Sequence, residues 1–238
     1  MKRKFDRLVS FDERSRQFPI RRLAPGTPRS VLWPCDLWLD QGPEGMCAGA
    51  AFTHELAAEP VAVRGLDLDY ARQLYWDGQR CDEFPGGAYP GARPWYEGTS
   101  ILGVAKALRK RGMIESYHFG FGLMDLVLGL QVGPPVLGSR WYELLEQPDE
   151  HGVVTLGGMM LGGHAYMCRG VDVERRRFFV RQSRGEQHGL RGDILVPYDV
   201  MEVLLQEDGE ACFPIGRQLT PVTRESGWSR FWKAITGR

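Results

Sequence analysis

Hydrophobic positions in the first half of the chain recur at a helical spacing. One i, i+3, i+4, i+8 stripe predicts a helix from Cys47 to about Glu59, ended by Pro60; its members are Ala48, Ala51, Phe52 and Leu56. A shorter apolar pattern predicts a second helix over about 69–76. Residues 100–111 give the clearest pattern, with Ser100 as a possible cap and Gly112 after the last turn. Residues 47–115 are therefore predicted to be helical.

After residue 115 the pattern changes to short β-type runs separated by turn residues. These runs predict strands at 135–137, 164–168, 178–181, 194–196 and 211–213, with one short helix over 200–205. A helical half followed by a β half (116–215) is typical of an α+β fold. We therefore expect residues 31–215 to form one domain built from a helical lobe and an antiparallel β lobe.

The two ends of the chain have different patterns. Residues 1–30 carry many basic residues and three prolines with little periodicity, which predicts an extended basic arm. In the tail, 216–238, an amphipathic helical stripe is formed by Trp228, Phe231, Trp232 and Ile235. Such a stripe can dock on its own domain, on a partner protein or on a membrane surface.

Composition narrows the function classes. Thirty basic and thirty acidic residues cancel, so no overall field favours nucleic acid as a partner. The five cysteines are odd in number and form no C-x-x-C pair, which argues against a disulfide framework and a zinc ribbon. We therefore expect no metal, no cofactor and a reducing, cytoplasmic location. No apolar run reaches the ~18 residues of a membrane span.

Candidate chemistry gathers where a turn-rich segment meets the first helix. Cys47 stands at that junction, where free backbone N–H groups and the helix dipole favour a thiolate. Gln41, six residues earlier, can point a side-chain N–H above the sulfur and complete an oxyanion hole with the N–H of Cys47. The alternative is a buried, inert cysteine.

Three segments in order resemble the papain-like cysteine peptidases. Residues 40–52 (DQGPEGMCAGAAF) resemble the active-site segment of that family, residues 162–172 resemble its histidine strand, and residues 182–192 (QSRGEQHGLRG) resemble its Asn-Ser-Trp-Gly loop. The similarity is to bacterial or bacteriophage members without a prodomain. It implies a papain-like α+β fold with the active site in the cleft between the two lobes.

The resemblance also assigns roles to residues. It implies Cys47 as the nucleophile, His164 as the base, Gln182 in the place of the asparagine that orients the base, and Gln41 in the oxyanion hole. Gln182 has one methylene more than asparagine, and Arg184, His188 and Ala48 stand where the family has tryptophans. The alternative for His164 is a core or metal-linked histidine beside Cys168.

The resemblance further implies substrate-binding roles for Gly98, Trp141 and Gly163. Gly98 lies in a segment that pairs with a peptide backbone in that family, and Trp141 is either a cleft residue or a core aromatic. The arm of residues 1–30 is too short for an inhibitory prosegment, so we expect no self-inhibition.

Three functions remain open at this point. The first is a cysteine endopeptidase acting on peptides or proteins, in a host cytoplasm or a virion if the gene belongs to a phage. The second is a weak or inactive papain-like scaffold that acts by binding, for example in a virion. The third is acyl transfer to an amine, because the acyl-enzyme chemistry is shared.

Overall fold

The computed structural model describes residues 4–8, 12–23, 26–83 and 86–219. Three helices form the helical lobe: α1 (Cys47–Ala57), α2 (Leu68–Cys81) and α3 (Ile101–Lys110). Asp67 caps α2 by accepting from Tyr70 N, and Ser100 caps α3 by accepting from Gly103 N. Helix α2 is longer than predicted because it continues through Gly78, where a Cβ would lie 2.7 Å from Val104 Cγ2 of α3.

An antiparallel sheet with the strand order β2-β7-β3-β4-β5-β6 forms the second lobe, and β1 pairs with β4 outside this order. The strands are β1 (Val31–Leu32), β2 (Ser116–Gly120), β3 (Val136–Tyr142), β4 (Met160–Asp172), β5 (Arg177–Arg181), β6 (Asp193–Pro197) and β7 (Glu210–Ile215). The predicted α+β architecture is confirmed, with a helical lobe followed by an antiparallel β lobe.

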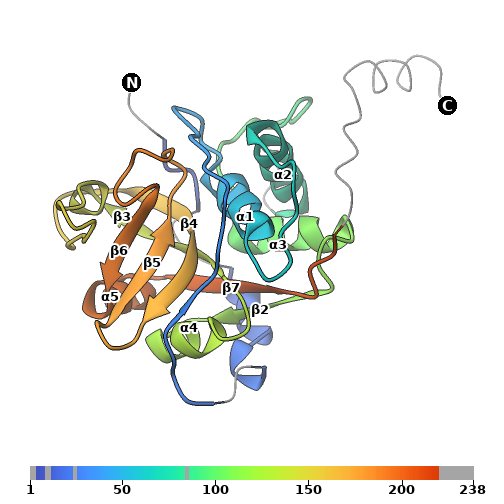
Figure 1. Cartoon of the computed structure of the whole chain (residues 1–238). Coiled ribbons are helices and arrows are strands. Elements are labelled where there is room, and N and C mark those ends of the chain that lie inside the picture. Colours follow the sequence, from blue (N-terminus) through green and yellow to red (C-terminus); the bar gives the residue numbers. More distant parts are fainter. Residues whose placement is uncertain (1–3, 9–11, 24–25, 84–85, 220–238) are drawn as a thin grey trace.

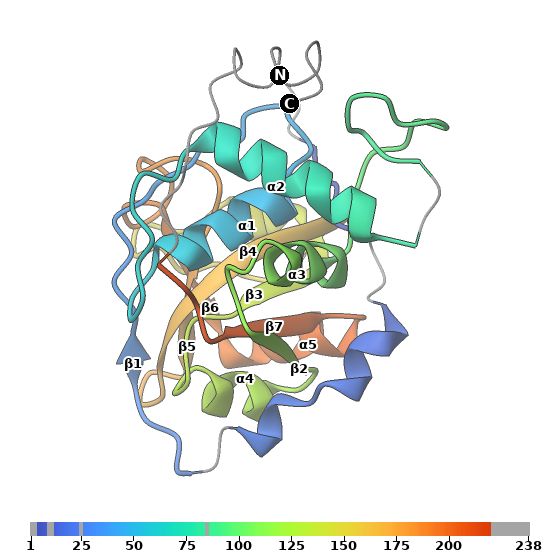
Figure 2. The same cartoon turned by 90° about the vertical axis from the view of Figure 1, so that its right-hand side faces the viewer.

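The sheet lies between two helical layers. Figure 2 shows α1, α2 and α3 on one side of it, and α4 (Leu123–Gly129) and α5 (Tyr198–Gln206) on the other. Short 3-10 turns complete the fold: η1 (Glu13–Gln17), η2 (Ile20–Arg22) and η3 (Glu143–Glu146). The sequence pattern did not predict β1, β2, α4 or these turns.

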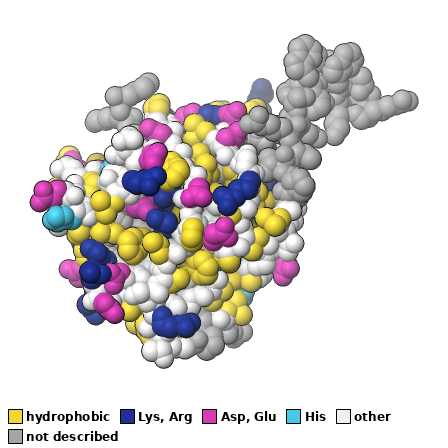
Figure 3. Space-filling model, viewed as in Figure 1, with side chains coloured by type: hydrophobic (Ala, Val, Ile, Leu, Met, Phe, Trp, Pro, Cys, Tyr) yellow, Lys and Arg dark blue, Asp and Glu magenta, His cyan; other side chains and the backbone are white. Residues whose placement is uncertain are grey.

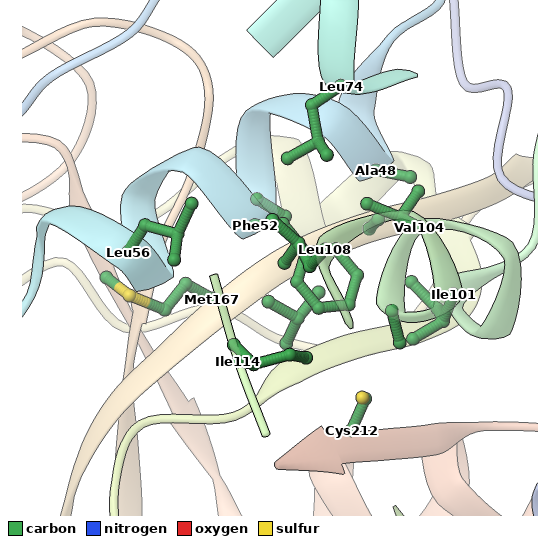
Figure 4. Packing of buried hydrophobic residues seen from close by; sticks show 14 of the residues in the cluster. Ala48, Phe52, Leu56, Leu74, Ile101, Val104, Leu108, Ile114, Met167 and Cys212 are labelled. Carbon is green, nitrogen blue, oxygen red and sulfur yellow. The ribbon is translucent and has the colours of Figure 1, made fainter. Parts of the chain in front are cut away.

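Two hydrophobic cores fill the space on either side of the sheet. Figure 4 shows the first, in which Phe52 of α1 packs with Leu108 of α3 and Met167 of β4. The second contains Trp141, Tyr166 and Phe178. Strand β4 contributes to both cores, so its backbone is held rigidly and can aim side chains with precision.

The chain ends depart from the expected arm and tail. Residues 12–23 form η1 and η2 and lie against β2 and α4, so part of the arm is folded. Residues 220–238, including the predicted amphipathic stripe, lie outside the described residues. Among the described residues, no helix has the length and apolarity to cross a membrane. On the face in Figure 3, acidic and basic side chains are interspersed.

Candidate active site

Cys47 is the first residue of α1, at the position that the sequence predicts. It follows Met46, the N-cap residue, which makes no side-chain capping hydrogen bond. The side chain is fully buried, and this burial raises the pKa of the thiol. The Asp6 carboxylate raises that pKa further, whereas backbone groups of Ala165, Asp6 and Arg7 lower it. The expectation of a low thiol pKa is therefore wrong for this arrangement, in which Cys47 is held as a thiol.

His164 lies on β4 next to Ala165, whose backbone acts on the Cys47 sulfur. Its Nε2 is 2.9 Å from Oε1 of Gln182. Because an amide oxygen only accepts, this contact requires the proton on Nε2 and leaves Nδ1 as the basic nitrogen. Nδ1 is buried and has no hydrogen-bond partner among the described residues, the Cys47 thiol included. Burial, with a smaller contribution from Arg184, lowers the pKa of His164 to about 3.

An aromatic cover for His164 comes from Trp141 on β3. The Trp141 and His164 ring centroids are 4.9 Å apart at 60°, and Trp141 is fully buried. Trp141 Nε1 donates to Glu146 Oε1 at 2.5 Å, and Glu146 forms an ion pair with Arg184. Trp141 is therefore a core residue against the imidazole, and the Arg184–Glu146 pair fixes the orientation of its indole.

Gln41 has its amide fixed on both sides. Its Oε1 accepts from Ser183 Oγ at 2.6 Å, and its Nε2 donates to Glu44 O at 2.7 Å and Lys4 O at 3.3 Å. These bonds direct one N–H at a carbonyl oxygen of the arm. The carbonyl of Lys4 thus occupies the place that an oxyanion hole offers to a substrate carbonyl.

The arm, Lys4–Leu8, passes between the two lobes and pairs with both. Arg7 N donates to Gly163 O at 3.0 Å on the β lobe. On the helical lobe, Thr99 N donates to Asp6 O at 3.1 Å and Leu8 N donates to Thr99 O at 3.3 Å. The arm therefore bridges the cleft as an extra strand.

Both glycines predicted to bind substrate contact the backbone of the arm. A Cβ at Gly163 would lie 2.2 Å from Arg7 O, and one at Gly98 would lie 2.9 Å from Asp6 O. The Gly98 φ of +105° adds a second reason for glycine there. The structure thus brings Gly98 and Gly163 to opposite walls of one cleft that a peptide backbone occupies.

Two side chains of the arm cover the reacting groups. The Phe5 ring packs edge-on against His164 with centroids 5.1 Å apart, and the Arg184 guanidinium lies 5.3 Å from the Phe5 centroid. The Asp6 carboxylate lies over Gly45, where a Cβ would be 1.3 Å from Oδ2. Sequence reasoning missed both contacts because the arm has no periodicity and its pairing is entirely long-range.

The fold is that of the papain-like cysteine proteases. Xylellain, a cysteine protease from Xylella fastidiosa, matches with a TM-score of 0.62 and 18% identity over 92% of this chain and 99% of its own. Procathepsin B from Trypanosoma congolense gives 0.58 and 11% identity over 89% and 87%. A cysteine protease of Carica candamarcensis gives 0.57 and 15% over 81% and 100%. No family model matches the sequence, and no curated protein is similar to it in sequence.

Proposed function

We propose that this protein is a cysteine peptidase that cleaves peptide bonds through Cys47. The observation that carries the proposal is the contact of 2.9 Å between His164 Nε2 and Gln182 Oε1, which leaves Nδ1 as the base. The sulfur lies beside the backbone of the next residue, Ala165, at the start of α1. The papain-like fold supports the same chemistry.

The catalytic cycle follows from these positions. Nδ1 of His164 takes the thiol proton, and the Cys47 thiolate attacks the substrate carbonyl carbon. The oxyanion accepts hydrogen bonds from Gln41 Nε2 and the Cys47 backbone N–H. The imidazolium then protonates the leaving amine, which departs from the thioester. Water, deprotonated by His164, hydrolyses the thioester and frees the thiol.

The arm holds the enzyme in a latent state, contrary to the expectation of no self-inhibition. Its Lys4 carbonyl takes the Gln41 amide, its Phe5 ring covers His164, and its Asp6 carboxylate disfavours the thiolate. A substrate can reach Cys47 only after Lys4–Leu8 has left the cleft. Activity therefore requires displacement or cleavage of the arm.

The test compares the full chain with Cys47→Ala on an unstructured protein substrate, after limited proteolysis or mutation of the arm. We expect cleavage by the first and none by the second, and labelling of Cys47 alone by a thiol-directed epoxide. Equal hydrolysis by both proteins would overturn the proposal. Product masses with and without an added amine separate hydrolysis from acyl transfer.

The second candidate is the silent scaffold, which the complete burial of Cys47 favours. Displacement of the arm decides between the two, because a scaffold stays inactive once the cleft is open. The endopeptidase mode, the cytoplasmic or virion location and a protein partner for the tail stay predictions.

A further inference from the structure

The side chain of Arg7 fills a closed pocket in the cleft. Its Nη2 lies 3.1 Å from Glu210 Oε1 and donates to Asp208 O at 3.3 Å. The side chains of Arg7 and Glu210 are 0% and 1% exposed. A guanidinium and a carboxylate are thus paired out of contact with water.

The pocket lies close to Cys47. Gly138 of β3 pairs with Glu210 of β7 on one side and with Ala165 of β4 on the other. Ala165 acts on the Cys47 sulfur, so a single strand separates the pocket floor from the nucleophile. Any side chain that enters this pocket belongs to a peptide lying across the reacting atoms.

The shape of the pocket suits a long, flat side chain. A Cβ at Gly138 would lie 2.4 Å from Nε of Arg7 and 2.8 Å from Ile101 Cγ1. Gly138 therefore leaves the channel along which the Arg7 side chain runs, with Ile101 as a wall. Ser15 and Asp12, at the start of η1, lie close enough to Glu210 to influence its pKa, so they flank the far end of the pocket.

Electrostatics then decides which side chain can replace Arg7. A buried carboxylate left without a cation is strongly unfavourable. Oε2 of Glu210 has no hydrogen-bond partner among the described residues, so the carboxylate has a second acceptor to offer. An arginine side chain satisfies both needs, because its fork of N–H groups matches a carboxylate.

We propose that, once the arm has left, this pocket binds an arginine side chain of the peptide substrate, with Glu210 as the specificity-determining residue. The inference rests on the peptidase activity proposed above and adds its substrate class: peptides with an arginine close to the scissile bond. Arg7 of the arm holds the place of that substrate arginine in the latent enzyme.

The kinetic test uses the full chain with Arg7→Ala, which empties the pocket. Fluorogenic peptides that differ only in carrying arginine, citrulline or leucine near the scissile bond are compared. Citrulline has nearly the shape of arginine without its charge. We expect kcat/KM for the arginine peptide to exceed that for citrulline at least about tenfold, and Glu210→Gln in the same background to remove the difference. Equal rates for arginine and citrulline in Arg7→Ala would overturn the inference.

A binding test works without catalysis. In the full chain with Arg7→Ala and Cys47→Ala, the arginine peptide is expected to raise Tm and the citrulline peptide to leave it unchanged. If Arg7→Ala does not fold, Arg7→Met keeps the aliphatic stem and serves as the background. Equal Tm shifts by the two peptides would contradict the arginine pocket.

The two proposals fail in different ways. Cys47-dependent cleavage of the leucine and arginine peptides at equal rates leaves the peptidase standing and removes the arginine pocket. Selective binding of the arginine peptide without any Cys47-dependent cleavage leaves the pocket standing and removes the peptidase.

Discussion

At the residue scale, the site depends on how a glutamine substitutes for an asparagine. The extra methylene of Gln182 made its reach uncertain from sequence, yet its Oε1 lies 2.9 Å from His164 Nε2. Gln182 is itself buried, so water does not compete for this bond. The backbone after β5 is therefore placed for the longer side chain, and the orientation of His164 depends on that length.

The first prediction follows from this reach. Gln182→Asn withdraws the amide oxygen by about one bond length, so the bond to His164 weakens and the ring loses its orientation. In an enzyme with its arm displaced, we expect kcat/KM to fall roughly tenfold, and further in Gln182→Ala. A rise in kcat/KM with Asn would instead mean that Gln182 is a damaged form of the orienting residue.

The second prediction concerns the charge of Arg184. Its guanidinium disfavours a protonated His164 and thereby contributes to the low pKa of that imidazole. In Cys47→Ala, Arg184→Met is expected to raise the pKa of His164, measured by NMR titration of the ring protons. Arg191→Met, at an exposed arginine paired with Glu186, is the matched control and should leave the titration unchanged. An unaltered His164 pKa in Arg184→Met would refute this role.

At the element scale, periodic elements were predictable and aperiodic ones were not. The Cys47 helix and β4 were visible because their apolar spacing is set by the core they cover. Strand β2 and helix α4 were missed; both are short, and β2 pairs with β7, nearly a hundred residues later in the chain. The pairing of Lys4–Leu8 with Thr99 and Gly163 is also long-range, and a basic stretch without periodicity gives no signal for it.

The third prediction tests the arm as an element. Gly45→Ala places a methyl group where the Asp6 carboxylate lies, so Asp6 must move away from Cys47. We expect the full chain to gain peptidase activity several-fold, because the charge that raises the pKa of the thiol moves away and the arm binds less tightly.

The control for Gly45→Ala is the combination with Asp6→Ala. Once the carboxylate is gone, the added methyl has much less to displace, so Gly45→Ala should add little to the activity of Asp6→Ala. Initial rates on one fluorogenic peptide measure all four proteins. Additive gains from the two changes would show that Gly45 acts independently of the arm.

At the scale of the whole molecule, the end of the β lobe stabilises the helix that carries Cys47. Arg217 follows β7 and donates to Ala58 O at 2.8 Å and Glu59 O at 3.0 Å, just beyond the end of α1. It also forms an ion pair with the buried Glu55 of α1 at 3.3 Å. The helix is therefore fixed at its far end by the β lobe, which keeps Cys47 in register with β4.

The fourth prediction uses the pH dependence of this link. Burial raises the pKa of Glu55 to about 7 against the attraction of Arg217. Between the unperturbed value of 4.5 and about 7 the folded protein then binds more protons at Glu55 than the unfolded chain does. The contribution of Glu55 to the free energy of unfolding therefore falls as pH rises through that window and is constant on either side of it.

Urea denaturation of the wild type and Glu55→Gln at pH values from 4 to 8 measures this contribution as a difference, so the titration of other groups cancels. We expect the stability of the wild type relative to Glu55→Gln to fall by on the order of 2 kcal/mol across the window. Glu202→Gln, at an exposed position of α5, is the control and should give a flat difference. A flat difference for Glu55→Gln as well would mean that Glu55 keeps an unperturbed pKa and that Arg217 fully compensates its burial.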